Sequence, residues 1–428
     1  AGITVALDQL QTSYAAAKEL SAELNQPVDN TPPAIIFTST PTLLVLVSGD
    51  PVLKPVAGAP DFQRVMNSRA LILVDRDGAA FLEATGYWYR ADRLGGSFAE
   101  IGSVPSSVVD AAKAAEREDA PDAMLPEDGK RPASPPAIMI ATTPTELIQT
   151  KGTAELQPVA GTSLLTMTNA DHAVFMDPNG NQYYVLISGR WFKAGDLKGP
   201  WAFVPPSSLP ADFAKISPND PKASVLVSAP GPPQAKEAAI AATIPQTATV
   251  SRSTALNVVY DGAPRFEAIK GTQLSYAVNT ATPVIELDAG AFYAVANGVW
   301  FTAASPFGPW RVADVVPDVI YTIPVSSPVH YVTYVHVYAA TADAVTVGYT
   351  PGYFGVALSD GMVVYGTGYS CTGYVGTIWY GCPVTYGYGA DFALDTAAGF
   401  AFGFATGWAI GAASPWWGPY WGVGPWGG

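Results

Sequence analysis

One segment of this chain occurs three times, and this repetition constrains the fold more than any other feature of the sequence. Residues 33–58 and 136–161 share a Pro-Ala-Ile start, a Thr-Pro-Thr step and a Pro-Val-Ala-Gly end, at a constant offset of 103 residues. A third, more diverged copy runs over residues 248–271. Because each copy of a repeat forms one structural unit, the body of the protein is predicted to contain three similar modules.

The second half of each copy places aromatic residues at two equivalent positions. The first position holds Trp88, Trp191 and Trp300, and the second holds Phe98, Trp201 and Trp310. Exposed rings on a sheet would stack on sugars, and three linked modules would add avidity. Trp beside Gly, Tyr and Phe in a strand is, however, ordinary core composition. We therefore expect core residues, with sugar binding as the alternative.

The pattern inside each copy indicates β-structure. Short runs rich in branched residues, such as 71–74 and 284–287, are bounded by Asp, Asn and Gly turns. Asp177, Asn179 and Asn181 alternate as in a calcium loop, but the downstream Glu of such a loop is missing, so a hairpin turn is favoured. The predicted fold class is mainly β, with tandem small β-sheet modules.

Helical signals occur between and outside the modules. Apolar residues recur at helical spacing over residues 4–24, and shorter helices are predicted over 106–119 and 230–240 beside Pro-rich linkers. The expected order is an N-terminal helix (1–30), module 1 (31–110), a helix and Pro-rich linker (111–135), module 2 (136–216), a linker with a short helix (217–245), module 3 (246–324), an aromatic strand region (325–390) and a Gly-rich apolar helix with an aromatic tail (391–428).

The C-terminal quarter of the chain has no cationic side chain. Residues 312–428 contain no Lys, Arg or Glu, yet they hold 13 of the 21 Tyr and six of the 11 Trp. Aromatic area at this density is normally buried in a core, an interface or a membrane. We therefore expect other copies of the chain, other chains or lipid to cover it.

A Gly residue recurs at every fourth position within residues 396–413. On a helix this spacing lines one face with glycine and lets a neighbouring backbone approach closely. The residues predicted to make assembly contacts are Gly399, Gly403, Gly407, Gly411, Phe400, Phe404, Trp408, Trp416, Trp417 and Trp421. The alternatives for this segment are a helix in or on a membrane, or an irregular Gly-rich strand.

The two cysteines of the chain are Cys371 and Cys382, and the residues between them include a Gly-rich turn. Two paired strands would bring the thiols together, so we expect a disulfide in an oxidising compartment, with two buried thiols as the alternative. The chain starts with Ala-Gly and no Met, which suits removal of a signal peptide. We therefore expect an exported protein.

Several functions are not expected. The net charge of −14 with only 22 Lys and Arg argues against nucleic acid as a partner. His330 and His336 could share one face of a strand, but no further ligand joins them, and His172 stands apart. The chain lacks a phosphate loop, a nucleophile elbow and a haem-attachment motif. No metal, cofactor or enzymatic activity is expected.

The repeated Gly-x-Trp-Phe-x-Ala and Gly-Pro-Trp patterns, with residues 347–353 and 399–408, resemble a group of uncharacterised secreted or envelope proteins of Gram-negative bacteria. Some members are labelled carbohydrate-binding family V/XII. The resemblance covers the chain from about residue 30 to its end. It implies a bacterial protein that is secreted or held at the cell surface.

These observations favour a non-enzymatic exported structural protein. We expect it to assemble with copies of itself into an extracellular filament or surface structure through its uncharged aromatic C-terminal region. Truncation after Pro328 should then leave a soluble monomer. The alternatives are a cell-surface carbohydrate-binding protein that uses the aromatic residues of the modules, and an envelope protein whose C-terminal helix inserts into a membrane.

Overall fold

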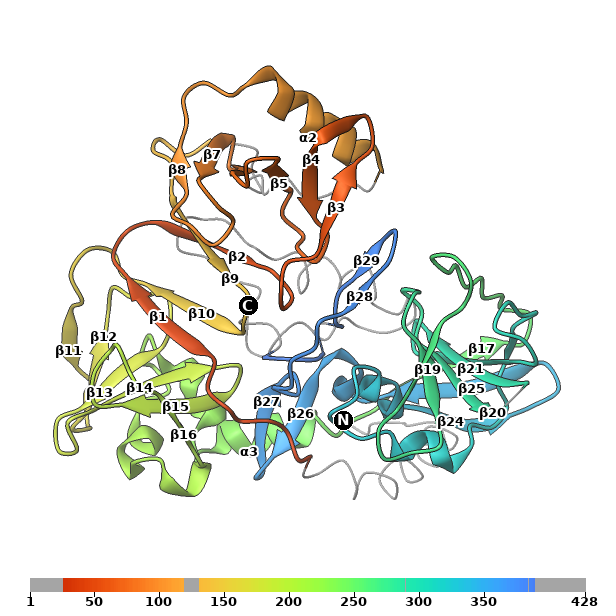
Figure 1. The fold of residues 1–428 in the computed structure, drawn as a ribbon. Coiled ribbons are helices and arrows are strands. Elements are labelled where there is room, and N and C mark those ends of the chain that lie inside the picture. Colours follow the sequence, from red (N-terminus) through yellow and green to blue (C-terminus); the bar gives the residue numbers. More distant parts are fainter. Residues whose placement is uncertain (1–25, 119–130, 289, 384, 389–428) are drawn as a thin grey trace.

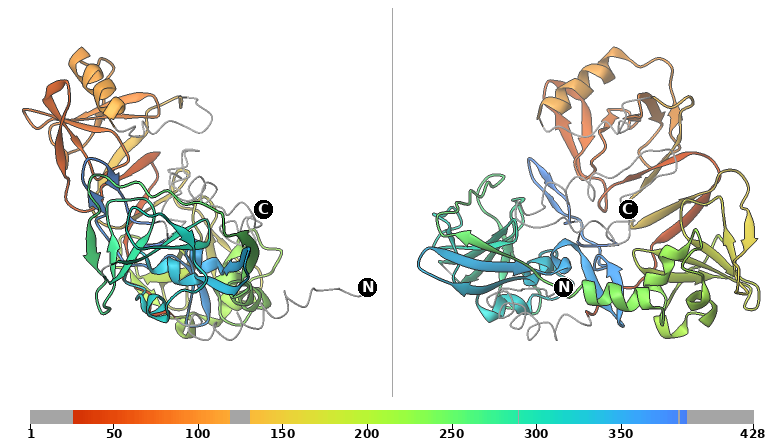
Figure 2. Two further views of the ribbon diagram at one scale, coloured as in Figure 1. Left: turned by 90° about the vertical axis from the view of Figure 1, so that its right-hand side faces the viewer. Right: turned by 180° about the vertical axis from the view of Figure 1, so that it is seen from behind.

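The computed structural model describes residues 26–118, 131–288, 290–383 and 385–388. Within them the protein is mainly β, as predicted. Three six-stranded sheets form three lobes, and the last described part of the chain lies between the lobes (Figures 1 and 2). The helices predicted at 4–24 and 396–413 lie outside the described residues.

Each repeat copy contains one antiparallel meander, in which strands adjacent in sequence are adjacent in the sheet. The sheet of module 1 contains β3 (Leu53–Val56), β4 (Ala59–Val65), β5 (Ile72–Asp75), β6 (Ala80–Ala84), β7 (Tyr87–Ala91) and β8 (Ala99–Glu100). That of module 2 contains β11 (Leu156–Pro158), β12 (Leu165–Met167), β13 (Val174–Asp177), β14 (Gln182–Ile187), β15 (Arg190–Ala194) and β16 (Ala202–Val204). That of module 3 contains β18 (Phe266–Ala268), β19 (Ser275–Ala277), β20 (Val284–Asp288), β21 (Ala291–Ala296), β22 (Val299–Ala303) and β23 (Arg311–Val312).

The hairpin that leads into Trp88, Trp191 or Trp300 has the same two-residue turn in all three sheets. Its two residues have positive φ in every copy: Thr85-Gly86, Ser188-Gly189 and Asn297-Gly298. Positive φ at both positions defines the type I′ turn, whose twist matches that of paired strands. The repeat therefore extends to backbone conformation.

Two strands at the start of module 1 pair with two strands at the start of module 2. These strands are β1 (Ala34–Thr38), β2 (Thr42–Leu46), β9 (Ala137–Ala141) and β10 (Thr145–Gln149). β1 pairs in parallel with β10, and β2 pairs in parallel with β9. Pairing between the two repeat copies thus links the lobes of modules 1 and 2.

Helices complete the modules in two ways. The predicted helix after module 1 is α2 (Ser106–Glu118), and it packs its Val and Ala residues on the module 1 sheet. Modules 2 and 3 instead continue into short 3₁₀ helices: η2 (Pro206–Ser208), η3 (Ala211–Lys215) and η4 (Ala223–Ser228), then η5 (Asp318–Thr322) and η6 (His330–Tyr334). The second predicted linker helix is α3 (Pro233–Ala241).

The first strand of module 3, β17 (Gln246–Ser251), pairs with a strand that begins more than 80 positions further along the chain. Its partner is β25 (Ala344–Tyr349), which also pairs with β24 (Val335–Ala340). Val335, Val345 and Val347 are fully buried in the cores around this sheet. The first part of the predicted aromatic strand region is therefore part of module 3.

The remaining described residues form two small hairpins between the lobes (Figure 1). After η7 (Pro351–Phe354), the first hairpin joins β26 (Val356–Ser359) and β27 (Met362–Tyr365). The second joins β28 (Tyr374–Val375) and β29 (Trp379–Tyr380). We call residues 356–388 the central segment.

Candidate functional site

The repeated aromatic residues lie in or against the module cores. Trp191, Trp300 and Trp310 are 2%, 0% and 8% exposed, and Trp88 and Trp201 pack against buried clusters. Trp201 also stacks on Phe37. A buried ring cannot stack on a sugar, which excludes Trp191, Trp300 and Trp310 from an exposed platform, whereas Trp88 and Trp201 are half-buried.

Two of these Trp residues make the same hydrogen bond in different modules. Trp191 donates its indole N–H to Ser228 O at 2.8 Å, and Trp300 donates its own to Val335 O at 2.7 Å. In module 2 the acceptor is the last residue of η4, and in module 3 the acceptor directly follows η6. Sequence comparison of the copies missed this extension of the repeat, because the helices share few residue identities.

Arg190 anchors the central segment on module 2. Its side chain is 1% exposed and donates to Tyr365 O at 2.9 Å and to Gly366 O at 2.8 Å. It also donates to Asn30 Oδ1 at 3.0 Å and lies over the Tyr388 ring. One guanidinium therefore holds three segments of the chain together.

The turn before Arg190 fits closely against the same segment. Tyr365 N donates to Ser188 O at 2.9 Å. A Cβ atom on Gly189 would overlap the carbonyl oxygen of Val363, so this close approach requires glycine. Modules 1 and 3 carry Tyr87 and Val299 where module 2 carries Arg190, and this difference was the available sequence signal.

The second hairpin of the central segment is closed by the predicted disulfide. Cys371 and Cys382 lie at disulfide distance, with their Cα atoms 6.3 Å apart, on either side of the paired strands β28 and β29. We call residues 371–382 the disulfide finger.

The disulfide finger contacts two modules. On the module 1 side, Ser48 donates to Cys371 O at 3.3 Å, and Lys54 donates to Gly376 O. On the module 3 side, Asp261 Oδ2 accepts from Thr377 N at 2.7 Å and from Ile378 N at 2.9 Å. The finger thus bridges modules 1 and 3.

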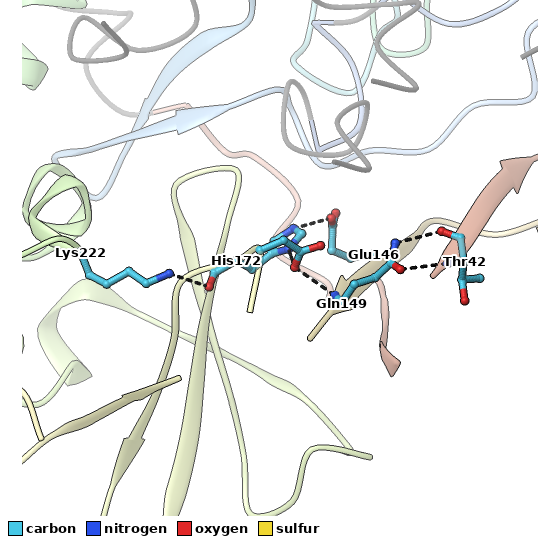
Figure 3. Close-up of polar contacts among 6 residues, drawn as sticks. Thr42, Glu146, Gln149, His172 and Lys222 are labelled. Carbon is cyan, nitrogen blue, oxygen red and sulfur yellow. Dashed lines mark hydrogen bonds and ion pairs between the residues drawn. The ribbon is translucent and has the colours of Figure 1, made fainter. Parts of the chain in front are cut away.

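A polar network lies where the paired strands meet module 2 (Figure 3). The Gln149 side chain exchanges two 2.9 Å hydrogen bonds with the backbone of Thr42. Asp171 Oδ1 accepts from Gln149 N at 3.0 Å and contacts His172 Nδ1 at 2.7 Å. His172 Nε2 contacts Glu146 Oε1 at 2.9 Å. The imidazole therefore lies between two carboxylates.

This arrangement keeps His172 charged. Burial alone would lower the pKa of His172, but the hydrogen bonds to Asp171 and Glu146 outweigh it and raise the pKa to about 10. A histidine with this pKa stays protonated near neutral pH and cannot act there as a general base. The geometry is that of a buried ion-pair network that joins β10 to module 2.

The other polar residues considered from the sequence also make contacts that stabilise the fold. His330 lies in the 3₁₀ helix η6 and not on a strand with His336, so the predicted shared strand face is wrong. Its Nδ1 contacts Ile323 O at 2.7 Å, and His336 stacks on Tyr321. Asn179 N donates to Asp177 Oδ1, as in a hairpin turn. In the described ranges, no group of three His, Cys, Asp or Glu residues could hold a metal ion.

Much of the aromatic area between residues 312 and 388 is covered by the chain itself. Tyr334, Tyr349 and Tyr353 are buried in one cluster with Trp300. Tyr388 packs against Phe192 of module 2. These residues are therefore covered without the other molecules that the sequence led us to expect. The assembly residues predicted within 399–421 lie outside the described part of the chain.

Comparison with protein-family models, curated proteins and solved structures found no match to this chain. Of the helices in the described ranges, none has the length and apolar character needed to cross a membrane.

Proposed function

We propose that this chain is an exported, non-enzymatic structural protein that associates with copies of itself through residues 389–428. The composition of that segment carries the proposal. It contains five of the 11 Trp of the chain, and its only fixed side-chain charges are Asp391 and Asp395. Burial of such apolar area drives association at about 25 cal/mol per Å² before the costs of association are subtracted.

The structural part of the proposal is supported by the way the body is held together. Arg190 and the disulfide finger tie all three modules to the central segment. A body linked in this way suits a building block with a fixed shape. Disulfides persist in oxidising compartments, which supports export to the bacterial envelope or surface.

The test compares the full chain with a chain that ends at Tyr388, by negative-stain electron microscopy and light scattering. The full chain is expected to form filaments or rings, whereas the truncated chain should be a monomer with an unchanged thermal transition of the body. Assembly of the truncated chain would contradict a role for residues 389–428.

Binding to a surface polysaccharide is the second candidate function, and the resemblance to proteins labelled carbohydrate-binding favours it. The surface involved would have to differ from the buried Trp positions. Titration of the truncated monomer with chitin, cellulose and peptidoglycan fragments tests this candidate. A titration without a binding signal would exclude these glycans as ligands.

Contact of the C-terminal segment with a membrane is tested by carbonate extraction.

A further inference from the structure

The pairing between the first two repeat copies is reciprocal. Equivalent residues are 103 positions apart, so β9 corresponds to β1 and β10 corresponds to β2. β1 pairs with β10 and β2 pairs with β9, so each strand pairs with the copy of its own neighbour. The flanking hydrogen bonds are also reciprocal: Ala34 N donates to Pro144 O, and Ala137 N donates to Pro41 O.

This reciprocity means that modules 1 and 2 have exchanged strands. Leu43 and Val45 of β2 pack in the module 1 core together with Ile138 and Ile140 of β9. Conversely, β1 contributes Ile35 to the module 2 core that contains Ile148 of β10. Each core therefore contains its own second strand and the first strand of the other copy. This is the arrangement of a domain swap, here within one chain.

Module 3 lacks this exchange: β17, the counterpart of β1 and β9, pairs with β25, and residues 255–259, the counterpart of β2 and β10, form no strand. Val250 of β17 packs in one cluster with Leu256 and Val258, which follow it in the same copy. Thr254 N donates to Ser251 O, so the chain turns back after β17. The first strand of the segment therefore accepts different partners: a strand of the other copy in modules 1 and 2, and β25 in module 3.

A proline distinguishes the two arrangements. Pro41 and Pro144 lie between the exchanged strands, and Thr254 occupies the equivalent position of module 3. Proline restricts the preceding residue to extended conformations. The connections at Thr40 and Thr143 are therefore held open, which carries the second strand away from the first.

We propose that these strands also exchange between two copies of the chain, so that β1 and β2 of one copy pair with β10 and β9 of the next. The pairings are the same within and between chains, so only the effective concentration of the partner decides between them. When two copies exchange with each other they close into a dimer, and when each copy exchanges with the next they form rings or filaments. This inference rests on the proposed self-association and adds a second surface to it, which opens when chains unfold and refold together, so a chain that ends at Tyr388 and is not unfolded stays monomeric.

The experiment uses two full-length single-cysteine additions to the native chain. One carries Leu46→Cys and the other carries Ala141→Cys, because these residues are register partners in the β2–β9 pair and neither is buried. The two variants are mixed, unfolded, refolded together over a range of concentrations and oxidised. A disulfide-linked dimer that increases with chain concentration is expected on a non-reducing gel.

Two controls decide the interpretation. Leu46→Cys mixed with Leu156→Cys, an exposed residue of β11 that pairs with β12, should give only background dimer. A single chain with both Leu46→Cys and Ala141→Cys should close within the chain. The inference is overturned if the matched mixture gives no more dimer than the mismatched one, or if the double variant fails to close.

The outcome is separable from that of the proposed function. Filaments without cross-linked dimers would reject strand exchange and leave the role of residues 389–428 standing. Cross-linked dimers from refolded chains that end at Tyr388 would support the exchange, and assembly of such chains without unfolding would reject the role of the C-terminal segment.

Discussion

At the scale of single residues, the most informative positions are those where one repeat copy departs from the others. Arg190 replaces Tyr87 and Val299 of the other copies, and Glu146 replaces Leu43 and Leu256. Both residues are buried, and both bind groups that only module 2 contacts. Arg190 binds the central segment and Glu146 binds His172 within module 2, so a charged residue at a core position of this repeat marks a contact that the other copies lack.

Arg190→Met tests the anchor of the central segment. Met fills similar space but cannot donate, so the carbonyls of Tyr365 and Gly366 lose a buried donor. We expect a loss of about 3 kcal/mol in the free energy of unfolding, measured by urea denaturation. Arg76→Met is the control, because its ion pair with Asp61 is exposed and should contribute less than about 1 kcal/mol. Equal stability of the two variants would contradict the anchor.

His172 predicts a specific pH dependence. Its pKa rises from 6.5 to about 10 on folding, so the stability it contributes is full below pH 6.5 and is lost as the pH rises through 10. His172→Gln should therefore cost ~3 kcal/mol near pH 6.5 and little above pH 10. Urea denaturation across this range measures the difference.

The matched control for His172→Gln adds Glu146→Leu, the residue type found in the other two copies. Removing both charges should recover part of the lost stability, because no carboxylate then stays buried opposite a neutral side chain. A cost of His172→Gln that does not vary with pH would mean that the imidazole is neutral in the folded protein.

At the scale of elements, the disulfide finger shows how a short hairpin acquires order. β28 and β29 contain two residues each, too few to be stable alone. The disulfide closes the hairpin, and Asp261 and Ser48 hold it from two sides. Its order therefore depends on the covalent link and on both modules.

Replacing both Cys371 and Cys382 by Ser should loosen the finger and leave the module cores intact. A loop of this length contributes about 2 to 3 kcal/mol through its disulfide. Hydrogen exchange is expected to rise in residues 366–382 and to stay unchanged in β14 (Gln182–Ile187). Ser48→Ala, which removes one contact at the edge of the finger, should have a much smaller effect. Unchanged protection of the finger in the double variant would contradict this account.

At the scale of the whole molecule, the aromatic C-terminal quarter divides into two parts. Residues up to 388 complete module 3 and join the modules, and residues 389–428 remain for the proposed assembly. Truncation after Pro328 would therefore remove β24 and β25 and leave β17 without its partner. The structure leads to the opposite of the sequence-based expectation for that truncation.

We expect a chain that ends at Pro328 to lose the folded core of module 3 and to aggregate. The cause is the loss of Val335, Val345 and Val347, which are fully buried. A chain that ends at Tyr388 is the control and should keep its thermal transition. Circular dichroism and size-exclusion chromatography measure both effects. A chain that ends at Pro328 and is soluble, with a fully cooperative unfolding transition, would refute the role of these strands.

Local sequence patterns are enough to predict the three-copy repeat, the mainly β class, the turns and helices near α2 and α3, and the pairing of Cys371 with Cys382. These features depend on residues close together in the chain, where periodicity, turn residues and spacing are directly readable. The burial of Trp191 and Trp300 was also the favoured interpretation, because their neighbours have core composition.

The contacts between distant segments follow from the three-dimensional fold alone. The exchange of β1 with β9, the insertion of β24 and β25 into module 3, and the contact of His172 with Glu146 join residues that no local pattern relates. The pairing of β-strands depends on the direction in which each connection leaves its strand and on the closing of long loops. The strands of the first two copies have similar sequences, so their sequences do not indicate which of them pair. Pro41 and Pro144 lie in the two copies that exchange strands, whereas Thr254 lies at this position in module 3, where β17 pairs with β25 instead.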